Sequence, residues 1–215
     1  MGLQGCWRRL DAEFPRFAAT GTPMAFSDYL GSLDQWLAAT REQFPMEPAS
    51  HLWLYSFAGG VLEPACTVMA EYETVPSLDL ASGTVFQRGM WAGYRTDAEA
   101  GSLAAAGAGW ARSVGRIIDA LDDPRPQALW MLAADGLVQA AVQSANVAFE
   151  DGEALATELF AGFAGVHPLA AGLPAFSHRG DTVRAARRSC CMIFRAGAEY
   201  CSLCPKARAA HGPND

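Results

Sequence analysis

Four cysteines near the carboxyl end constrain the fold of this chain more than any other feature. Cys190 and Cys191 are adjacent, nine residues follow, and Cys201 and Cys204 then form a Cys-x-x-Cys pair, so the pattern is C-C-x9-C-x2-C. In a reducing compartment, such a group is more typical of a metal or redox site than of a disulfide framework. We therefore expect this part of the chain to fold so that the four thiols converge.

The sequence favours a cytoplasmic, reducing location. Residues 1–17 carry charged side chains and no apolar run, unlike a secretory signal. The longest stretch without Asp, Glu, Lys or Arg covers residues 159–178, and it contains Pro168, Pro174 and three glycines. Such a stretch makes a poor membrane-spanning helix. We predict a cytoplasmic protein with reduced thiols and no membrane insertion.

Charge is distributed unevenly along the chain. The net charge of −7 argues against a protein that binds nucleic acid by general phosphate attraction. Residues 181–215 nevertheless hold six basic and three acidic side chains, a local balance of +3. Nearby cations lower thiol pKa values and raise the reduction potential of an anionic cluster. A basic tail is also common in proteins without such chemistry.

Hydrophobic periodicity predicts a mostly helical α+β fold: a helical body, a small antiparallel sheet and a cysteine-rich C-terminal segment. We place the body at residues 1–180 and the segment at 181–215. A hairpin is expected around Ser82-Gly83, a break at Gly59-Gly60, and a loop over residues 165–180. Helices are expected at 7–17, 27–44, 64–72, 98–121, 127–149 and 152–163.

Familiar motifs of nucleotide and hydrolase chemistry are missing from the sequence. It contains no P-loop, no G-x-G-x-x-G after a strand, no G-x-S-x-G and no H-E-x-x-H. Gly107-Ala108-Gly109 lies in an alanine-rich helical stretch and is interpreted as part of that helix. Cys6 and Cys66 are interpreted as small buried hydrophobes. The four histidines (His51, His167, His178 and His211) show no metal-ligand spacing.

Three interpretations of the cysteine pattern remain open on spacing alone. Zinc usually takes its four ligands from two C-x2–4-C pairs, whereas here one pair has no spacer. A [2Fe–2S] cluster offers two metal atoms to the divergent side chains of adjacent cysteines, and four thiolates are its usual ligand set. A disulfide pair is the third interpretation, as an oxidation product after cluster loss.

The run R-R-S-C-C-M-I-F-R…Y-C-S-L-C-P, residues 187–205, resembles the C-terminal motif of the FhuF-like ferric-siderophore reductases. In that family the two cysteine pairs ligate one [2Fe–2S] cluster, so the resemblance implies Cys190, Cys191, Cys201 and Cys204 as the cofactor and metal ligands. The family's usual gap between the pairs is ten residues, one more than here. The motif implies no catalytic residue and no siderophore contact.

The resemblance implies an iron–sulfur oxidoreductase that passes one electron from a [2Fe–2S] cluster to chelated Fe(III) and releases Fe(II) in the cytoplasm. The expected partners are a ferric siderophore of hydroxamate type, docked by residues 1–180, and an electron-donor protein such as a ferredoxin or flavin reductase. Arg187, Arg188 and Arg195 are candidates to attract an anionic chelate or donor, or to compensate the charge of the cluster.

A different class of function is the alternative. In it, zinc or an iron–sulfur cluster only staples the C-terminal segment of a binding or scaffold protein of a siderophore or other biosynthetic pathway, without reductase activity.

Overall fold

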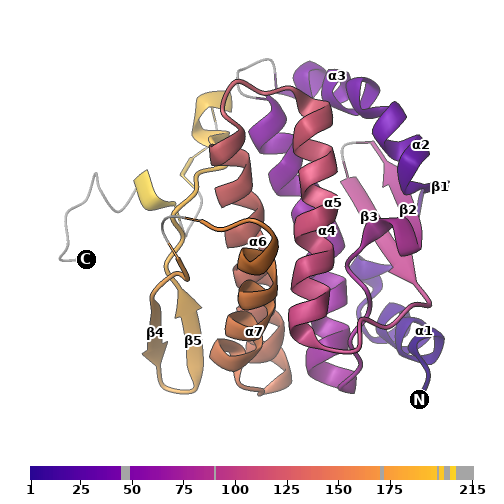
Figure 1. The fold of residues 1–215 in the computed structure, drawn as a ribbon, viewed down its shortest axis with the longest axis vertical. Helices are drawn as coiled ribbons and strands as arrows, with labels where there is room; N and C mark the ends of the chain where they lie inside the picture. Colours follow the sequence, from indigo (N-terminus) through magenta and orange to yellow (C-terminus); the bar gives the residue numbers. More distant parts are fainter. Residues whose placement is uncertain (45–48, 90, 170–171, 198, 201–203, 207–215) are drawn as a thin grey trace.

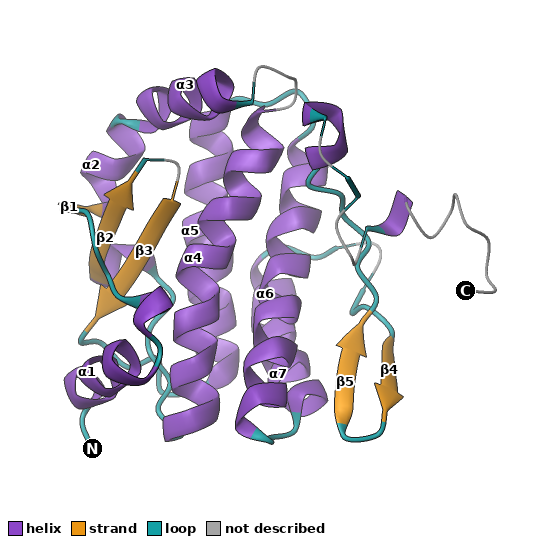
Figure 2. Ribbon diagram, turned by 180° about the vertical axis from the view of Figure 1, so that it is seen from behind, coloured by secondary structure: helices purple, strands orange, loops and turns teal. Residues whose placement is uncertain are grey.

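The computed structural model describes the chain except for residues 45–48, 90, 170–171, 198, 201–203 and 207–215 (Figure 1). Long helices form its centre, and they pack most extensively as two pairs, α4 with α6 and α5 with α7. Figure 2 shows the first pair in front of the second. The helices are α4 (Ala49–Tyr72), α5 (Leu103–Leu121), α6 (Pro126–Ala148) and α7 (Gly152–Val166).

A small antiparallel sheet lies beside α4, with strand order β1-β2-β3. Its strands are β1 (Thr22–Ala25), β2 (Gly83–Arg88) and β3 (Trp91–Thr96). Around it lie α1 (Leu3–Glu13), α2 (Phe26–Gly31), α3 (Leu33–Gln43) and the short 3-10 turns η1 (Pro15–Phe17) and η2 (Leu80–Ser82). The predicted fold class, a mostly helical body with a small antiparallel sheet, is confirmed.

A second hairpin lies on the other side of the helices, against α6 (Figure 1). It consists of β4 (Phe176–Arg179) and β5 (Thr182–Ala185), and the 3-10 turn η3 (Ile193–Ala196) follows it. The hairpin spans the predicted boundary at residue 180. The division into 1–180 and 181–215 stays a prediction.

Stacked aromatic rings run through the core between the helices. Phe57 of α4 lies 5.1 Å from Trp53, 5.3 Å from Tyr29 and 6.3 Å from Trp110 of α5, measured between ring centroids. All four side chains are fully buried. The indole N–H of Trp110 donates to the carbonyl oxygen of Ala133 on α6, so the polar atom of this ring is satisfied inside the core.

Glycines let α5 and α7 approach each other closely. A Cβ on Gly107 would lie 1.9 Å from the carbonyl oxygen of Leu159, and one on Gly162 would lie 1.8 Å from that of Ala104. Because neither helix has room for a side chain there, their backbones can touch. Gly107 is therefore a helix-packing residue, and the interpretation of Gly107-Ala108-Gly109 as part of a helix is confirmed.

The expected break at Gly59-Gly60 is wrong, because α4 continues through both glycines and through Pro64. A Cβ on Gly60 would lie 1.9 Å from the carbonyl oxygen of Ala92, so Gly60 allows β3 to pack on the helix. Gly60 also lies four residues before Pro64. Because proline has no N–H, the carbonyl of Gly60 has no helical donor. Burial of most of α4 in the core offsets the poor helix propensity of these residues.

Other element boundaries also differ from the expectations. The helix predicted over residues 27–44 divides at Ser32 into α2 and α3. Ser82 ends η2 and Gly83 begins β2, so the hairpin turns after Arg88 instead. The loop predicted over 165–180 contains β4. Cross-strand pairing, which is non-local, decided the two strand positions, and local turn signals could not reveal it.

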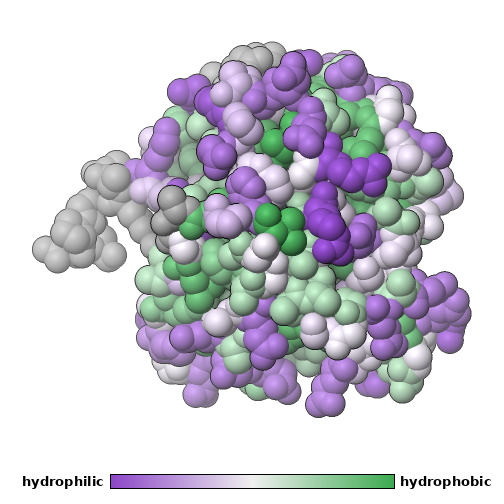
Figure 3. Space-filling view, viewed as in Figure 1, coloured by the Kyte–Doolittle hydropathy of each residue, from purple (hydrophilic) through white to green (hydrophobic). Residues whose placement is uncertain are grey.

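On the face seen in Figure 3, hydrophobic and weakly hydrophobic residues gather across the lower middle, and hydrophilic residues lie along the upper and lower edges and right of the centre. No helix in the described part of the chain is both long and apolar enough to cross a bilayer.

Candidate metal centre

The structure brings two of the four predicted ligands together. The sulfur atoms of Cys190 and Cys204 lie 3.9 Å apart, although fourteen positions separate them in the chain. Cys191 and Cys204 are buried, and Cys190 is half-buried. Cys201 lies outside the described residues. Among the described residues, no three side chains of His, Cys, Asp or Glu lie close enough together to hold a metal ion.

The sulfur–sulfur distance fits shared metal ligation. Two thiolates on one tetrahedral metal, with metal–sulfur bonds of about 2.3 Å, lie about 3.8 Å apart. A disulfide needs about 2.05 Å, so Cys190 and Cys204 do not form one in this structure. The donor set in the sequence, four thiols, is also the usual set for a [2Fe–2S] cluster. The residues present therefore fit the implied cofactor.

The backbone around the adjacent cysteines turns sharply. Met192 has φ of 60°, in the left-handed region that non-glycine residues seldom adopt. Its N–H points back and donates to the sulfur of Cys190 over 3.3 Å. Hydrogen bonds to ligand sulfurs raise the potential of an iron–sulfur cluster. This turn thus gives Cys190 an N–H donor directly after the cysteine pair.

The pKa of the Cys190 thiol is raised, mainly by burial and further by the neighbouring thiols of Cys204 and Cys191, while the N–H of Met192 opposes the rise. The expectation that nearby arginines lower thiol pKa values is not met at Cys190. Grouped thiols of this kind ionise when a cation binds them, which couples metal binding to proton release.

Asp135 of α6 anchors the residues just before the cysteine pair. Its side chain is fully buried, and one carboxylate oxygen accepts the backbone N–H groups of Arg188 at 2.7 Å and Ser189 at 2.5 Å. The guanidinium of Arg188 donates to the other oxygen at 3.2 Å through both Nε and Nη2. The carboxylate thereby fixes the chain one residue from Cys190.

More polar side chains of α6 hold the hairpin that leads to the cysteines. The amide of Asn146 donates to the carbonyl of Val183 and accepts its N–H, at 2.8 and 3.0 Å. Gln139 donates to the carbonyl of Ala185 at 3.0 Å. Sequence analysis missed Asp135, Gln139 and Asn146. The available signal was polar side chains within an otherwise apolar helix.

The three arginines near the cysteines have different surroundings. Arg188 is paired with Asp135, so its charge is largely compensated. Arg187 is buried, and its guanidinium lies 4.6 Å from the ring centroid of Tyr55 on α4. Arg195 is exposed on η3. The structure therefore separates residues that the sequence analysis treated as one group.

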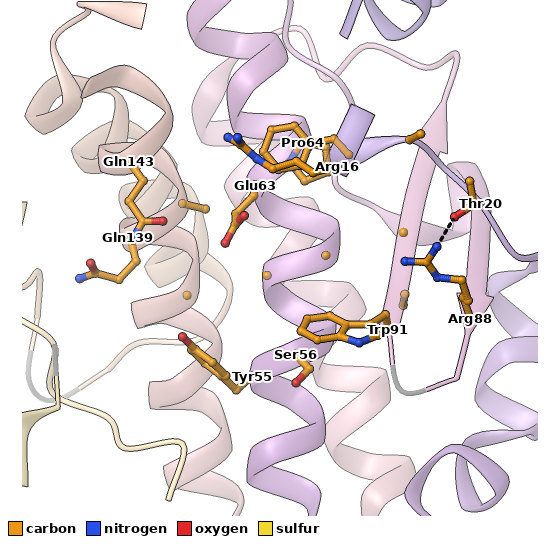
Figure 4. A pocket seen from close by; sticks show the side chains of 18 of the residues that line it. Arg16, Thr20, Tyr55, Ser56, Glu63, Pro64, Arg88, Trp91, Gln139 and Gln143 are labelled. Carbon is orange, nitrogen blue, oxygen red and sulfur yellow. Dashed lines mark hydrogen bonds between the residues drawn. The ribbon is translucent and has the colours of Figure 1, made fainter. Parts of the chain in front are cut away.

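A cavity of about 410 Å³ lies between α4, α6 and the β2–β3 hairpin (Figure 4). Arg187 is one of its lining residues. We call it the α4–α6 cavity. Its other charged lining residues are Arg16, Glu63 and Arg88. Nothing in the sequence placed a cavity here, because its walls come from segments far apart in the chain.

The two cysteines outside the C-terminal group are buried, as expected. Cys66 is fully buried, and burial raises the pKa of its thiol to about 12, so it is an inert core residue. Cys6 is also buried. His178 contacts Glu153 at 3.0 Å, and His167 stacks on Trp130 with ring centroids 3.8 Å apart. His211 lies outside the described residues.

Comparison with known families identifies the cysteine segment. The family model described as FhuF 2Fe-2S C-terminal domain matches residues 187–206, which include all four cysteines. We call these residues the cysteine segment. The match confirms the resemblance and supports a [2Fe–2S] cluster as the cofactor. No curated protein and no solved structure matches the chain.

Proposed function

We propose that this chain is a ferric-siderophore reductase whose cluster is held by Cys190, Cys191, Cys201 and Cys204. The match of residues 187–206 to the FhuF 2Fe-2S C-terminal domain carries the proposal. The 3.9 Å separation of the Cys190 and Cys204 sulfurs supports it, because that spacing suits two ligands of one iron atom. Cys191 and Cys201 would complete the set of four thiolates that holds the cluster.

The reaction is a one-electron transfer. When bound, a [2Fe–2S] cluster supplies a one-electron reductant. The substrate Fe(III) gains that electron inside its chelate and becomes Fe(II), which hard oxygen ligands hold far less tightly. The iron therefore leaves without any bond of the chelator being broken. We propose the cytoplasm as the place of release and a hydroxamate siderophore as the substrate that the resemblance implies.

The residues of the chain have three tasks in this reaction. The four thiols hold the cofactor, and the N–H of Met192 stabilises negative charge on the Cys190 sulfur. Asp135 fixes the residues before Cys190 on α6, so that the cysteine pair keeps its place relative to the helical body. Cys190 is only half-buried, which leaves a path for electrons between this sulfur and the surface. The electrons reach the cofactor from a separate donor protein.

The test uses protein purified without oxygen and reduced with dithionite, with the excess reductant removed by gel filtration. Ferric siderophore and a coloured ferrous trap are then added under argon. We expect the trap to register about one Fe(II) for each cluster that is reoxidised. The Cys204→Ser variant, carried through the same steps, is the control. A cluster that stays reduced while the trap stays colourless refutes the reductase and favours the metal-stapled binding protein.

A further inference from the structure

The α4–α6 cavity has the size and composition of a ligand site. Its volume of about 410 Å³ falls within the range of small-molecule pockets, about 300 to 1,000 Å³. A neighbouring hollow of about 310 Å³ shares Arg16, Phe17 and Glu63 with it, so a larger ligand has room to extend. Small residues make this space, since Gly59, Gly136 and Ala140 line the cavity without filling it.

The charge of the cavity opposes the charge of the chain. Three arginines and one glutamate line it, a formal charge of +2 in a chain of net charge −7. Arg88 donates to the hydroxyl of Thr20 at 3.2 Å (Figure 4), and the guanidinium of Arg16 lies 4.5 Å from the ring centroid of Phe17. Neither arginine takes part in the ion pairs found among the described residues.

Aromatic rings stand at the cavity beside these charges. Trp91 is 55% exposed and Tyr55 is 38% exposed, which is unusual for side chains of this size. Figure 4 shows the Trp91 ring beside Ser56 of α4, with Tyr55 near it. Flat apolar surfaces next to cationic groups suit an aromatic anion, whose rings stack while its oxygens meet the arginines.

Arg187 connects the cavity with the cysteine segment. It lines the cavity, and Cys190 follows three residues later. Consecutive Cα atoms are 3.8 Å apart, so the Cα atoms of these two residues lie within about 11 Å of each other. A ligand in the cavity is therefore close to the place where the cofactor is held.

We infer that the α4–α6 cavity binds the ferric chelate and selects chelates of net negative charge, with catecholate or carboxylate oxygens facing Arg16, Arg88 and Arg187. This inference rests on the proposed reductase function, but it replaces the hydroxamate chelate that the resemblance implies with a chelate of net negative charge. A hydroxamate chelate whose three groups neutralise Fe(III) would bring no net negative charge to Arg16 and Arg88. A tris-catecholate chelate carries three negative charges, which pair with the arginines of the cavity.

Glu63 is compatible with an anionic ligand. Its carboxylate reaches into the space between α4 and α6, opposite Gln139 and Gln143 (Figure 4). Burial raises the pKa of this carboxyl group, while Arg16 opposes the rise. Protonation of Glu63 therefore costs less than for an exposed glutamate, and it removes the one negative charge that the lining residues present.

The test measures binding without electron transfer. Ga(III) has the charge of Fe(III) but is not reduced under these conditions, so gallium chelates report docking alone. Titration calorimetry of the full-length, cluster-loaded protein compares a gallium tris-catecholate with a neutral gallium tris-hydroxamate. We expect the anionic chelate to bind at least tenfold more tightly, and its affinity to fall as salt is added. Equal affinities, or tighter binding of the neutral chelate, would overturn the inference.

Variants locate the site. Arg88→Gln should weaken binding of the anionic chelate about tenfold and leave the neutral one unchanged. Gly59→Leu should abolish binding of both, because a Cβ there would meet only Glu63 Oε1 within 4 Å and the rest of the side chain would fill the cavity. Arg41→Gln is the matched control, because Arg41 is exposed on α3 and does not line the cavity. Normal anion affinity in both cavity variants, with circular dichroism showing folded protein, would also overturn the inference.

The outcome separates this inference from the proposed function. If ferric chelates are reduced but the cavity variants bind gallium chelates as tightly as the unchanged protein does, the reductase stands and the cavity assignment fails. If the gallium chelates bind as expected but no Fe(II) forms, the cavity binds a chelate and the reductase fails.

Discussion

The helical body and the cysteine segment are held in place by different kinds of interaction. The body centres on fully buried apolar side chains such as Phe57 and Trp110. The cysteine segment is attached through a buried carboxylate, Asp135, and within the segment the thiols of Cys190 and Cys204 lie close together. Apolar burial is insensitive to redox state, whereas a metal site made of thiolates responds to it. The body can therefore stay folded while the segment gains or loses its metal.

The largest difference between the helical body and the cysteine segment should come from removing a metal ligand. Cys204→Ser should lose the cluster completely, because a serine hydroxyl does not replace the thiolate. The helical circular dichroism signal should remain. Iron and acid-labile sulfide analysis of anaerobic protein provides the measurement. Cys66→Ala, which changes a buried thiol of the body, should keep both iron and sulfide, and full iron retention in Cys204→Ser would contradict the ligand assignment.

Removing a ring from the aromatic core should destabilise the helical body and leave the cluster in place. Phe57→Ala should destabilise the body by about 3–5 kcal/mol, because the ring is fully buried and stacked on three others. Thermal unfolding followed by circular dichroism reports this change. The cluster should still be present at low temperature. Phe149→Ala is the control, since this ring is 93% exposed and its loss should leave the melting temperature unchanged.

Removing the anchor tests how the two regions are coupled. Asp135→Ala leaves the N–H groups of Arg188 and Ser189 without their acceptor, at a cost of about 1.5–3 kcal/mol for a hydrogen bond to a charged group. We expect iron loss to a chelator to accelerate at least tenfold, with a smaller change in the melting of the body. Asp119→Asn, an exposed carboxylate on α5, should behave as wild type. Unchanged iron loss in Asp135→Ala would show that the segment does not depend on this anchor.

The smallest effect concerns Glu63 and pH. Because burial raises its pKa, the native state binds the proton more tightly than the unfolded state does. The unfolding free energy therefore falls as pH rises above the ordinary glutamate value of 4.5, through the raised native pKa. Glu63→Gln should flatten this part of the stability curve and raise the melting temperature slightly at neutral pH. Melting curves between pH 4 and 8 measure the difference, and a parallel decline in both proteins would contradict it.

Local sequence signals predicted the helices that follow simple rules. Asp122 ends α5 in the left-handed conformation, and the Asp151 carboxylate caps α7 by accepting the N–H groups of Glu153 and Ala154. The same kind of signal failed at Gly59-Gly60. There the propensity to break the helix is outweighed by packing against β3, which local sequence does not contain.

The sequence by itself determined the cofactor chemistry, because the identity and spacing of four cysteines and their family pattern are properties of the chain. Only the tertiary structure decided what surrounds that chemistry. The fixing of the cysteine segment by Asp135, and the meeting of Arg16, Arg88 and Arg187 at one cavity, depend on contacts between residues far apart in sequence. Such contacts are set by how helices and strands pack, and periodicity in a single element carries no record of its neighbours.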